Sequence, residues 1–274
     1  CGQAGVEGEL RGHALVAAAL GGHFYHSGYP DGEPTTPSSI GWADIVQPTI
    51  TASAVLAAVD YRNRTGKGQW IDVAQIEVMA GFLAPALLDY EVNGRVLGRP
   101  GNRHPQAAPH GAFPCQGEDR WCAIAVFTDE EWRALRAAMG DPAWAAAARF
   151  ATLAGRKEHE DELERLIAEW TRQFTAEEAM ERLQKAGVAA GVVQTPGELV
   201  DVDPQLKARQ SFLRMAHPVI GECNHPTPAA KLSRTPVQMR TAPLLGEHTE
   251  YVCRQILGIS GEEFAALQEA GVLC

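Results

Sequence analysis

Apolar residues recur at helical spacing in the segment between Pro48 and Arg62. The apolar positions of this segment are Ile50, Val55, Ala58 and Val59. Such spacing is typical of a helix rather than a strand, and proline suits the first helical turn, where its missing N–H costs nothing. Basic Arg62 and Arg64 before Gly66 suit the last turn. We therefore predict a helix that starts at Pro48 and ends before Gly66.

The neighbouring segments complete an α/β pattern. Residues 69–73 are predicted to form a short strand, residues 11–20 and 75–90 are predicted to be helices, and residues 28–41 form a loop rich in glycine, proline and serine. A helix, a glycine turn and a strand in this order indicate an α/β domain with its site at a helix end. We assign residues 1–93 to this unit.

A small α/β domain is predicted at residues 115–198. It follows residues 94–114, whose prolines and glycines indicate a linker or an active-site loop. Alternating and apolar runs predict strands of this domain at residues 121–126 and 188–193.

Helices of the small domain are indicated by their start signals. Thr128 with Glu131, and Thr175 with Glu178, have the spacing of a capping box. A further helix is predicted at residues 156–174. Its apolar face comprises Leu163, Leu166, Ile167 and Trp170.

Residues 199–274 are predicted to be a linker and a tail that returns to the large domain. The prolines from Pro196 onward suit an extended segment. Ser260, followed three residues later by Glu263, predicts a last helix closed by Gly271.

Composition narrows the class of protein. The chain has 274 residues, 45% of them hydrophobic and 21% charged, as is ordinary for globular proteins. Its net charge of −10 argues against binding of nucleic acid. The apolar stretch at residues 14–20 is shorter than the roughly 20 residues of a membrane span, and no secretory leader precedes it, so we expect no membrane partner. The 6 scattered cysteines are expected to be reduced thiols of a cytoplasmic protein.

Asp44 is the candidate nucleophile. It lies just ahead of the predicted helix start at Pro48, where unpaired N–H groups and the positive end of the helix dipole favour a negative charge. A carboxylate is ionised at pH 7 without a base, but it is a weak nucleophile that needs an activated electrophile such as a thioester. The alternative is that Asp44 only caps the helix.

The chain resembles the class III CoA transferases, the CaiB/BaiF group that includes formyl-CoA transferase and alpha-methylacyl-CoA racemase. The likeness extends over almost the whole chain in order. The blocks that carry it are Asp44 with residues 62–72 (RNRTGKGQWID), 101–105 (GNRHP), 109–115 (PHGAFPC), 186–191 (AGVAAG) and 243–249 (PLLGEHT).

The resemblance implies an α/β fold with part of a Rossmann-like large domain, a small α/β domain and an interlocked dimer of ring-like subunits. Members of the family begin with an N-terminal segment that supplies the first strands of the large domain and many contacts to CoA. The present chain begins at Cys1, past that segment. We therefore expect a fragment, a processed form or a subunit that works as a homodimer or with a chain supplying the N-terminal region.

The resemblance also implies the chemistry. In the transferases, Asp44 would attack an acyl-CoA, pass through a mixed anhydride and become an aspartyl-CoA thioester, from which a small carboxylic acid takes the CoA. In the racemases, a histidine at the position of His13 would act with Asp44 to move a proton beside the thioester carbonyl. Ala14 stands where the racemases have aspartate, and a lone histidine at a helix start is more often structural.

Further residues are candidates for binding the substrate CoA thioester. The loop of Gly101, Asn102, Arg103 and His104 offers N–H groups and one cation for a carboxylate or an oxyanion; the alternative is a surface turn. Arg64 and Lys67 could bind CoA phosphates, or could simply be basic residues at a helix C-terminus.

No metal site is expected. His23 with His26, and Cys223 with His225, do not complete a set of four ligands. A non-enzymatic alternative remains, in which the chain is an inactive or structural subunit that needs a partner chain.

Overall fold

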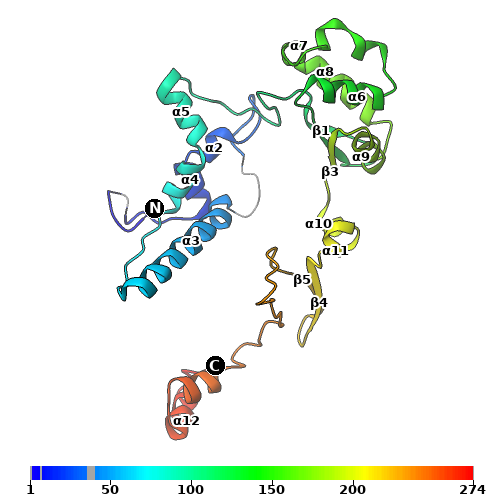
Figure 1. Cartoon of the computed structure of the whole chain (residues 1–274). Coiled ribbons are helices and arrows are strands. Elements are labelled where there is room, and N and C mark those ends of the chain that lie inside the picture. The colour runs from blue at the N-terminus through cyan, green and yellow to red at the C-terminus, as the bar shows by residue number, and fades with distance from the viewer. Residues whose placement is uncertain (1, 7, 36–40, 274) are drawn as a thin grey trace. The chain divides into compact units, whose positions relative to one another are not determined.

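The computed structural model describes residues 2–6, 8–35 and 41–273 and divides into two units, residues 1–193 and 194–274 (Figure 1). The helices of the first unit are α1 (Ala14–Leu20), α2 (His23–His26), α3 (Trp42–Thr65), α4 (Gln75–Phe82), α5 (Ala84–Asn93), α6 (Asp129–Ala138), α7 (Leu153–Glu158), α8 (Glu160–Thr171) and α9 (Ala176–Lys185), with short 3-10 turns η1 (Ala143–Ala146) and η2 (Ala148–Phe150). Its strands are β1 (His110–Pro114), β2 (Trp121–Ala125) and β3 (Ala189–Val192).

The second unit consists of short elements. These are α10 (Pro196–Asp201), α11 (Pro204–Ala208), the hairpin of β4 (Phe212–His217) and β5 (Gly221–Pro226), a π-helical turn η3 (Tyr251–Ile256) and α12 (Gly261–Glu269). Ser260 caps α12 by accepting from the N–H of Glu263 at 3.1 Å, as predicted. The extended linker was expected to start near residue 196, but helices and a hairpin occupy residues 196–226, because Thr195 and Asp203 cap two helix starts.

Helices α1, α3 and α4 pack together through small side chains in the first unit. Their shared core comprises Ala17, Ala18, Ala43 and Met79. A Cβ added to Gly21 would lie 2.5 Å from the Cβ of Met79. Only glycine therefore lets α1 and α4 approach to this distance.

Some elements predicted for this unit differ from those observed. Residues 69–73 carry no regular secondary structure, because a strand needs a partner and, over the described residues, none pairs with this segment. The helix predicted at 75–90 breaks at Leu83, directly before α5, which carries Pro85 in its first turn. The helix predicted at 156–174 breaks at His159, whose φ of −113° is not helical.

The small domain is built on an antiparallel sheet in the order β1-β2-β3. Phe113, Cys122 and Ile124 are buried on one face of the sheet, and helices α8 and α9 contact it. Both predicted capping boxes are present, at Thr128 with Glu131 and at Thr175 with Glu178. The capping signals of this domain are therefore confirmed.

A buried arginine joins the segments around the small-domain core. Arg156 has no exposed surface, and its guanidinium donates to the carbonyl oxygens of Ala108 at 2.8 Å and Phe150 at 3.2 Å. It also forms an ion pair with Asp129 at 2.9 Å and lies over the ring of Trp132. Desolvation by burial lowers the pKa of Arg156. The hydrogen bonds and the ion pair offset the free-energy cost of burying its charge.

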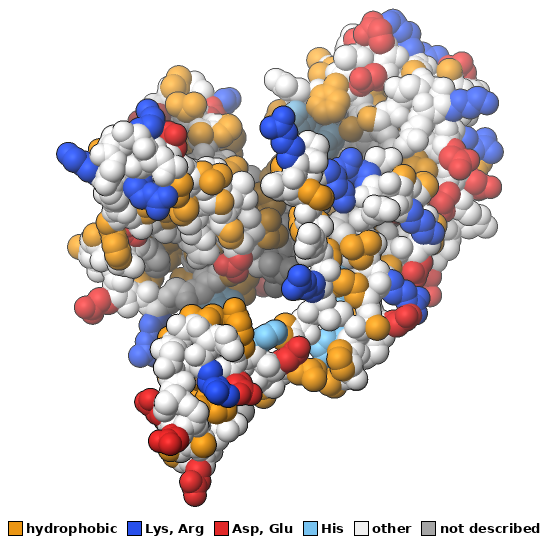
Figure 2. All heavy atoms as spheres, turned by 60° about the horizontal axis from the view of Figure 1, so that its bottom comes forward, with side chains coloured by type: hydrophobic (Ala, Val, Ile, Leu, Met, Phe, Trp, Pro, Cys, Tyr) orange, Lys and Arg blue, Asp and Glu red, His pale blue; other side chains and the backbone are white. Residues whose placement is uncertain are grey.

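Apolar side chains remain exposed on α3 and α5. The exposed ones include Ile45, Ile50, Val55, Leu56, Leu87, Leu88, Tyr90 and Val92, and Figure 2 shows apolar side chains among charged ones over the face in view. By length and composition alone, α3 could cross a membrane. Its 24 residues include an 18-residue stretch with a mean hydropathy of 1.3, and 11% of that stretch is buried. An apolar helix also forms the core of many soluble proteins.

Replacement of Arg156 by methionine is expected to lower the free energy of unfolding by about 3 kcal/mol, because it leaves buried carbonyl groups and Asp129 without their partner. Arg165→Met is the control, since Arg165 is exposed and pairs with Glu169 on the same face of α8, and its cost should stay within about 0.5 kcal/mol. Urea unfolding measures both. Equal costs would contradict the role of Arg156.

The thiol of Cys122 is expected to resist alkylation in the folded protein. Desolvation by burial raises its pKa to about 11, and its side chain is fully buried, so at pH 8 the reactive thiolate is scarce. Iodoacetamide labelling followed by peptide mass spectrometry should therefore find Cys223, which is half-buried, modified well before Cys122. Because the folded-state pKa is raised, the stabilising contribution of this thiol is complete below the unfolded value near 9 and is lost as pH rises through 11.

Candidate functional site

The carboxylate of Asp44 lies in the first turn of α3 and is exposed. The helix begins at Trp42 and its N-cap is Gly41, so Asp44 is inside the helix and does not cap it from outside. At this position the helix dipole favours the negative charge. The candidate nucleophile is therefore accessible and electrostatically supported.

The predicted start of α3 at Pro48 is wrong, because Pro48 lies inside the helix. A proline within a helix removes one hydrogen bond. The lost bond is the one that residue 48 would donate to the carbonyl of Asp44, four residues earlier. The signals that mark the true start are Gly41 and the acidic residue in the first turn.

Gln75 holds the carboxylate of Asp44. The side-chain Nε2 of Gln75 donates to Oδ1 of Asp44 at 2.9 Å, across 31 positions of sequence. Gln75 is the first residue of α4, and it follows Ala74, which is buried. No pattern in the sequence pointed to Gln75.

A close backbone contact brings the helix starts together. A Cβ added to Gly41 would lie 2.1 Å from the Cβ of Ala14 and 3.2 Å from Oδ2 of Asp44. Ala14 is the first residue of α1, so the starts of α1 and α3 touch, and the Gln75 bond adds the start of α4. The starts of α3 and α4 thus meet at one carboxylate, and the start of α1 touches that of α3.

His13 is the N-cap of α1. Its Nδ1 accepts from the N–H of Leu15 at 3.4 Å, and the residue is exposed. Because Nδ1 accepts, the neutral ring carries its proton on Nε2. The structure therefore gives His13 a capping role at the start of α1, and its role as a racemase base stays a prediction.

The loop at residues 101–104 is folded back on the chain. The N–H of Gly101 donates to the carbonyl of Gly28 at 2.9 Å, and that of Arg103 to Pro100 at 3.2 Å. Gly101 has a φ of 63°, and a Cβ there would lie 2.7 Å from the ring of Tyr29. Glycine is therefore required at this turn. Two N–H groups of the loop already donate hydrogen bonds within the chain.

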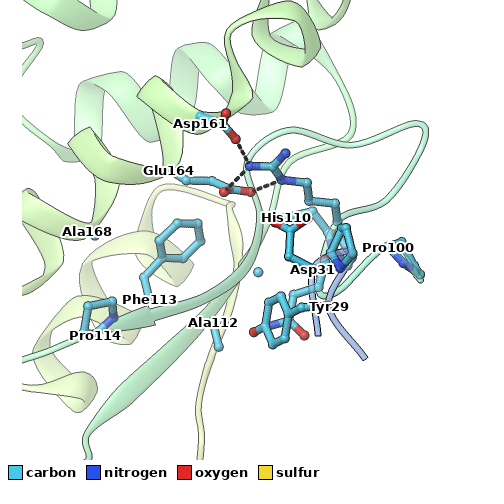
Figure 3. A pocket seen from close by; sticks show the side chains of 14 residues that line it. Tyr29, Asp31, Pro100, His110, Ala112, Phe113, Pro114, Asp161, Glu164 and Ala168 are labelled. Carbon is cyan, nitrogen blue, oxygen red and sulfur yellow. Dashed lines mark hydrogen bonds and ion pairs between the residues drawn. The ribbon is translucent and has the colours of Figure 1, made fainter. Parts of the chain in front are cut away.

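Arg103 is bound by carboxylates (Figure 3). Its guanidinium donates to both oxygens of Glu164, at 2.9 and 2.7 Å, and also to Asp161. The hydrogen bond with Glu164 is the main cause that raises the pKa of Arg103. The predicted cation for a substrate carboxylate is thus engaged within the chain, and its binding role stays a prediction.

A cavity of about 400 Å³ lies beside this arginine. Its lining includes Tyr29, Asp31, Asn102, Arg103, His110, Phe113, Asp161 and Glu164. Asn102 donates to the hydroxyl of Tyr29 at 3.1 Å, and its carbonyl accepts from Nδ1 of His110 at 2.6 Å. His104 packs against the ring of His110, with 5.3 Å between ring centroids. The loop thus forms one wall of a cavity in which acidic groups outnumber the arginine.

Arg64 and Lys67 lie at the other end of α3 from Asp44. Arg64 pairs with Asp60 at 2.9 Å, and both side chains are exposed. At a rise of about 1.5 Å per residue, the helix separates Arg64 from Asp44 by roughly 30 Å. The structure does not bring these two cations to the carboxylate.

Among the residues that the structure describes, no group of three or more His, Cys, Asp or Glu side chains could hold a metal ion. In the second unit, Sγ of Cys223 lies 3.1 Å from Nε2 of His225.

Comparison with known proteins gives a consistent family. The model of CoA-transferase family III matches residues 1–249. Succinyl-CoA–D-citramalate CoA-transferase of Chloroflexus aurantiacus is 33% identical over 99% of this chain and 67% of its own length. The beta subunit of succinyl-CoA–L-malate CoA-transferase from the same organism is 32% identical over 99% of this chain and 67% of its own length.

Among solved structures, a CAIB/BAIF family protein from Brucella suis superposes with a TM-score of 0.81 and 28% sequence identity. That match covers 93% of this chain and 65% of the Brucella protein. The chain therefore spans about two thirds of the length of the relatives it matches, at 67%, 67% and 65%.

Replacement of Gly41 by alanine is expected to separate the starts of α1 and α3, because the new Cβ would overlap that of Ala14. Overpacking of this kind costs about 1–3 kcal/mol in the free energy of unfolding, measured by urea denaturation. The double variant Gly41→Ala with Ala14→Gly should recover part of the loss. Gly12→Ala, where no atom lies within 4 Å, is the control, and an equal effect at Gly12 would argue against the close contact.

Proposed function

The chain belongs to CoA-transferase family III, and on that premise we propose that it transfers CoA between carboxylic acids with Asp44 as the nucleophile. The observation that carries the proposal is the exposed carboxylate of Asp44 in the first turn of α3, held by Gln75. An ionised carboxylate needs no base to attack a thioester. Both named relatives are CoA-transferases.

The reaction follows from the carboxylate as nucleophile. An oxygen of Asp44 attacks the thioester carbonyl carbon of the donor, and the C–S bond breaks to release CoA thiolate and leave a mixed anhydride. The thiolate then attacks Cγ of Asp44 and expels the donor acid as a carboxylate, which forms an aspartyl-CoA thioester. The acceptor carboxylate reverses these steps and leaves as the new acyl-CoA. No proton has to move in the sequence.

Succinyl-CoA is the proposed donor, and a small dicarboxylate is the proposed acceptor. The relatives are named for succinyl-CoA with D-citramalate and with L-malate. Both acceptors carry a second carboxylate. Selection of a dicarboxylate requires a positive or N–H-rich group at a fixed distance from the carboxylate that reacts.

The site is proposed to be completed by further polypeptide, from the same gene product or from a partner chain. The apolar side chains of α3 and α5 are exposed, and exposed apolar surface of this extent marks an interface. One relative is a named beta subunit, and the chain spans about two thirds of its relatives, at 67% and 65%. Without further polypeptide over these apolar faces, the isolated chain is expected to be inactive, which is the non-enzymatic alternative.

Racemase chemistry is the weaker alternative. It requires a second proton-transfer group, and His13 accepts at Nδ1 from the N–H of Leu15. Among the contacts of His13 with described residues, none favours its action as a base, so we do not propose this activity.

Replacement of Asp44 by asparagine is expected to abolish exchange of CoA between succinyl-CoA and a dicarboxylate such as L-malate. Asparagine keeps the size of the side chain and a carbonyl oxygen for Gln75 but cannot form an anhydride. The rate of acyl-CoA formation, followed by liquid chromatography, measures the loss.

Asp60→Asn provides the matched control, because Asp60 lies on the same helix in a surface ion pair with Arg64, and its activity should equal that of the unmodified protein. Full activity of Asp44→Asn would overturn the assignment of the nucleophile. Exchange at the alpha carbon of a 2-methylacyl-CoA in heavy water, without CoA transfer, would instead support the racemase alternative.

A further inference from the structure

The two oxygens of the Asp44 carboxylate have different surroundings. Oδ1 accepts from Nε2 of Gln75 at 2.9 Å. Oδ2 lies over Gly41, 3.2 Å from the position that a Cβ would occupy. One oxygen is therefore held by a donor, and the other faces a backbone position without a side chain.

From this asymmetry we infer that Gln75 is a catalytic residue, which directs attack through Oδ2 and stabilises the negative charge that forms on Oδ1 when the aspartyl carbonyl is itself attacked. The inference rests on the proposed transferase function. It concerns the stage at which Asp44 is the electrophile, after it has acted as the nucleophile.

The electron flow places the charge on Oδ1. When Oδ2 becomes the bridging oxygen of the mixed anhydride, Oδ1 is the carbonyl oxygen of the aspartyl group. CoA thiolate forms a bond to Cγ, and the carbonyl electron pair moves to Oδ1. That pair returns as the bond between Cγ and the bridging oxygen breaks and the donor carboxylate leaves. Attack of the acceptor carboxylate on the aspartyl thioester again puts the pair on Oδ1, and CoA thiolate leaves.

A glutamine amide suits both stages. Its NH₂ group donates to an ionised carboxylate and to an oxyanion alike, and it neither gains nor loses a proton at physiological pH. Removing a single donor from an oxyanion site lowers kcat by about 10²–10³-fold. A neutral donor also leaves the charge of Asp44 unopposed, so the carboxylate stays reactive.

The position of Gln75 is fixed by packing. It is the first residue of α4, between buried Ala74 and the turn that leads to buried Met79. Met79 in turn contacts Gly21 of α1 at a distance that admits no Cβ. The donor therefore comes from a rigid element, as a preorganised oxyanion donor requires.

The test compares Gln75→Leu, Gln75→Glu and Gln47→Leu. Gln47 lies one turn from Asp44 on α3, and its amide donates to Thr51 at 2.7 Å, so Gln47→Leu makes the same change without touching the carboxylate. Rapid-quench mass spectrometry of the peptide that contains Asp44 gives the rates at which the CoA adduct forms from succinyl-CoA and disappears on addition of the acceptor acid.

Gln75→Leu should slow both adduct formation and adduct consumption by about 10²-fold or more, while Gln47→Leu matches the unmodified protein. Gln75→Glu should be equally slow at pH 8, where its carboxylate cannot donate and repels Asp44. It should regain activity relative to the unmodified protein as pH falls, because the protonated acid donates again. The ratio to the unmodified protein removes the effects of His13 and Glu77, which both proteins carry.

Each outcome decides the inference. Equal adduct rates in Gln75→Leu and Gln47→Leu, or a Gln75→Glu profile parallel to that of the unmodified protein, would overturn it. If Gln75→Leu does not fold, as judged by circular dichroism, the pH profile of Gln75→Glu still decides. Absence of any adduct on Asp44 in the unmodified protein is a different result, since it removes the proposed function and not only the role of Gln75.

Discussion

The structure depends on one steric constraint, the contact between Gly41 and Ala14. With no Cβ at position 41, the starts of α1 and α3 lie close enough that a methyl group would not fit. This contact sets the first turn of α3, where Asp44 lies, against the start of α1. Gly21 lets α4 pack on the same helix α1, and Gln75 at the start of α4 reaches Oδ1 of Asp44. Without the close approach, Asp44 would be an ordinary acidic residue in the first turn of a helix.

The two halves of the first unit are stabilised differently. The small domain buries large side chains such as Trp132, Phe150 and Leu163, and it ties Arg156 into its core. The helices around Asp44 share a core of small side chains, and α3 and α5 leave apolar residues exposed. The candidate nucleophile is therefore set by close helix contacts rather than by a large core, and further polypeptide is expected to cover the apolar faces of α3 and α5.

The sequence predicted what local chemistry determines. The capping boxes at Thr128 and Thr175 are present because a hydroxyl and a carboxylate three residues apart satisfy each other's N–H groups. Pro48 was misread because its position in the first turn is only a preference, and tertiary packing placed it inside α3. The prediction of a strand at residues 69–73 is wrong because a strand depends on a partner strand, which a local pattern does not show. Gln75 was missed because its bond to Asp44 spans 31 positions.

The central claim is that Asp44 exchanges a carboxylate oxygen with the donor and acceptor acids. In the proposed sequence, the acceptor carboxylate attacks Cγ of Asp44 with one of its own oxygens, and that oxygen remains on Asp44 when the new acyl-CoA leaves. Turnover with an acceptor labelled with heavy oxygen, followed by mass spectrometry of peptides, measures this directly. The account predicts the label in the peptide that contains Asp44 and its absence from the peptide that contains Asp60. Turnover that leaves Asp44 unlabelled would contradict it.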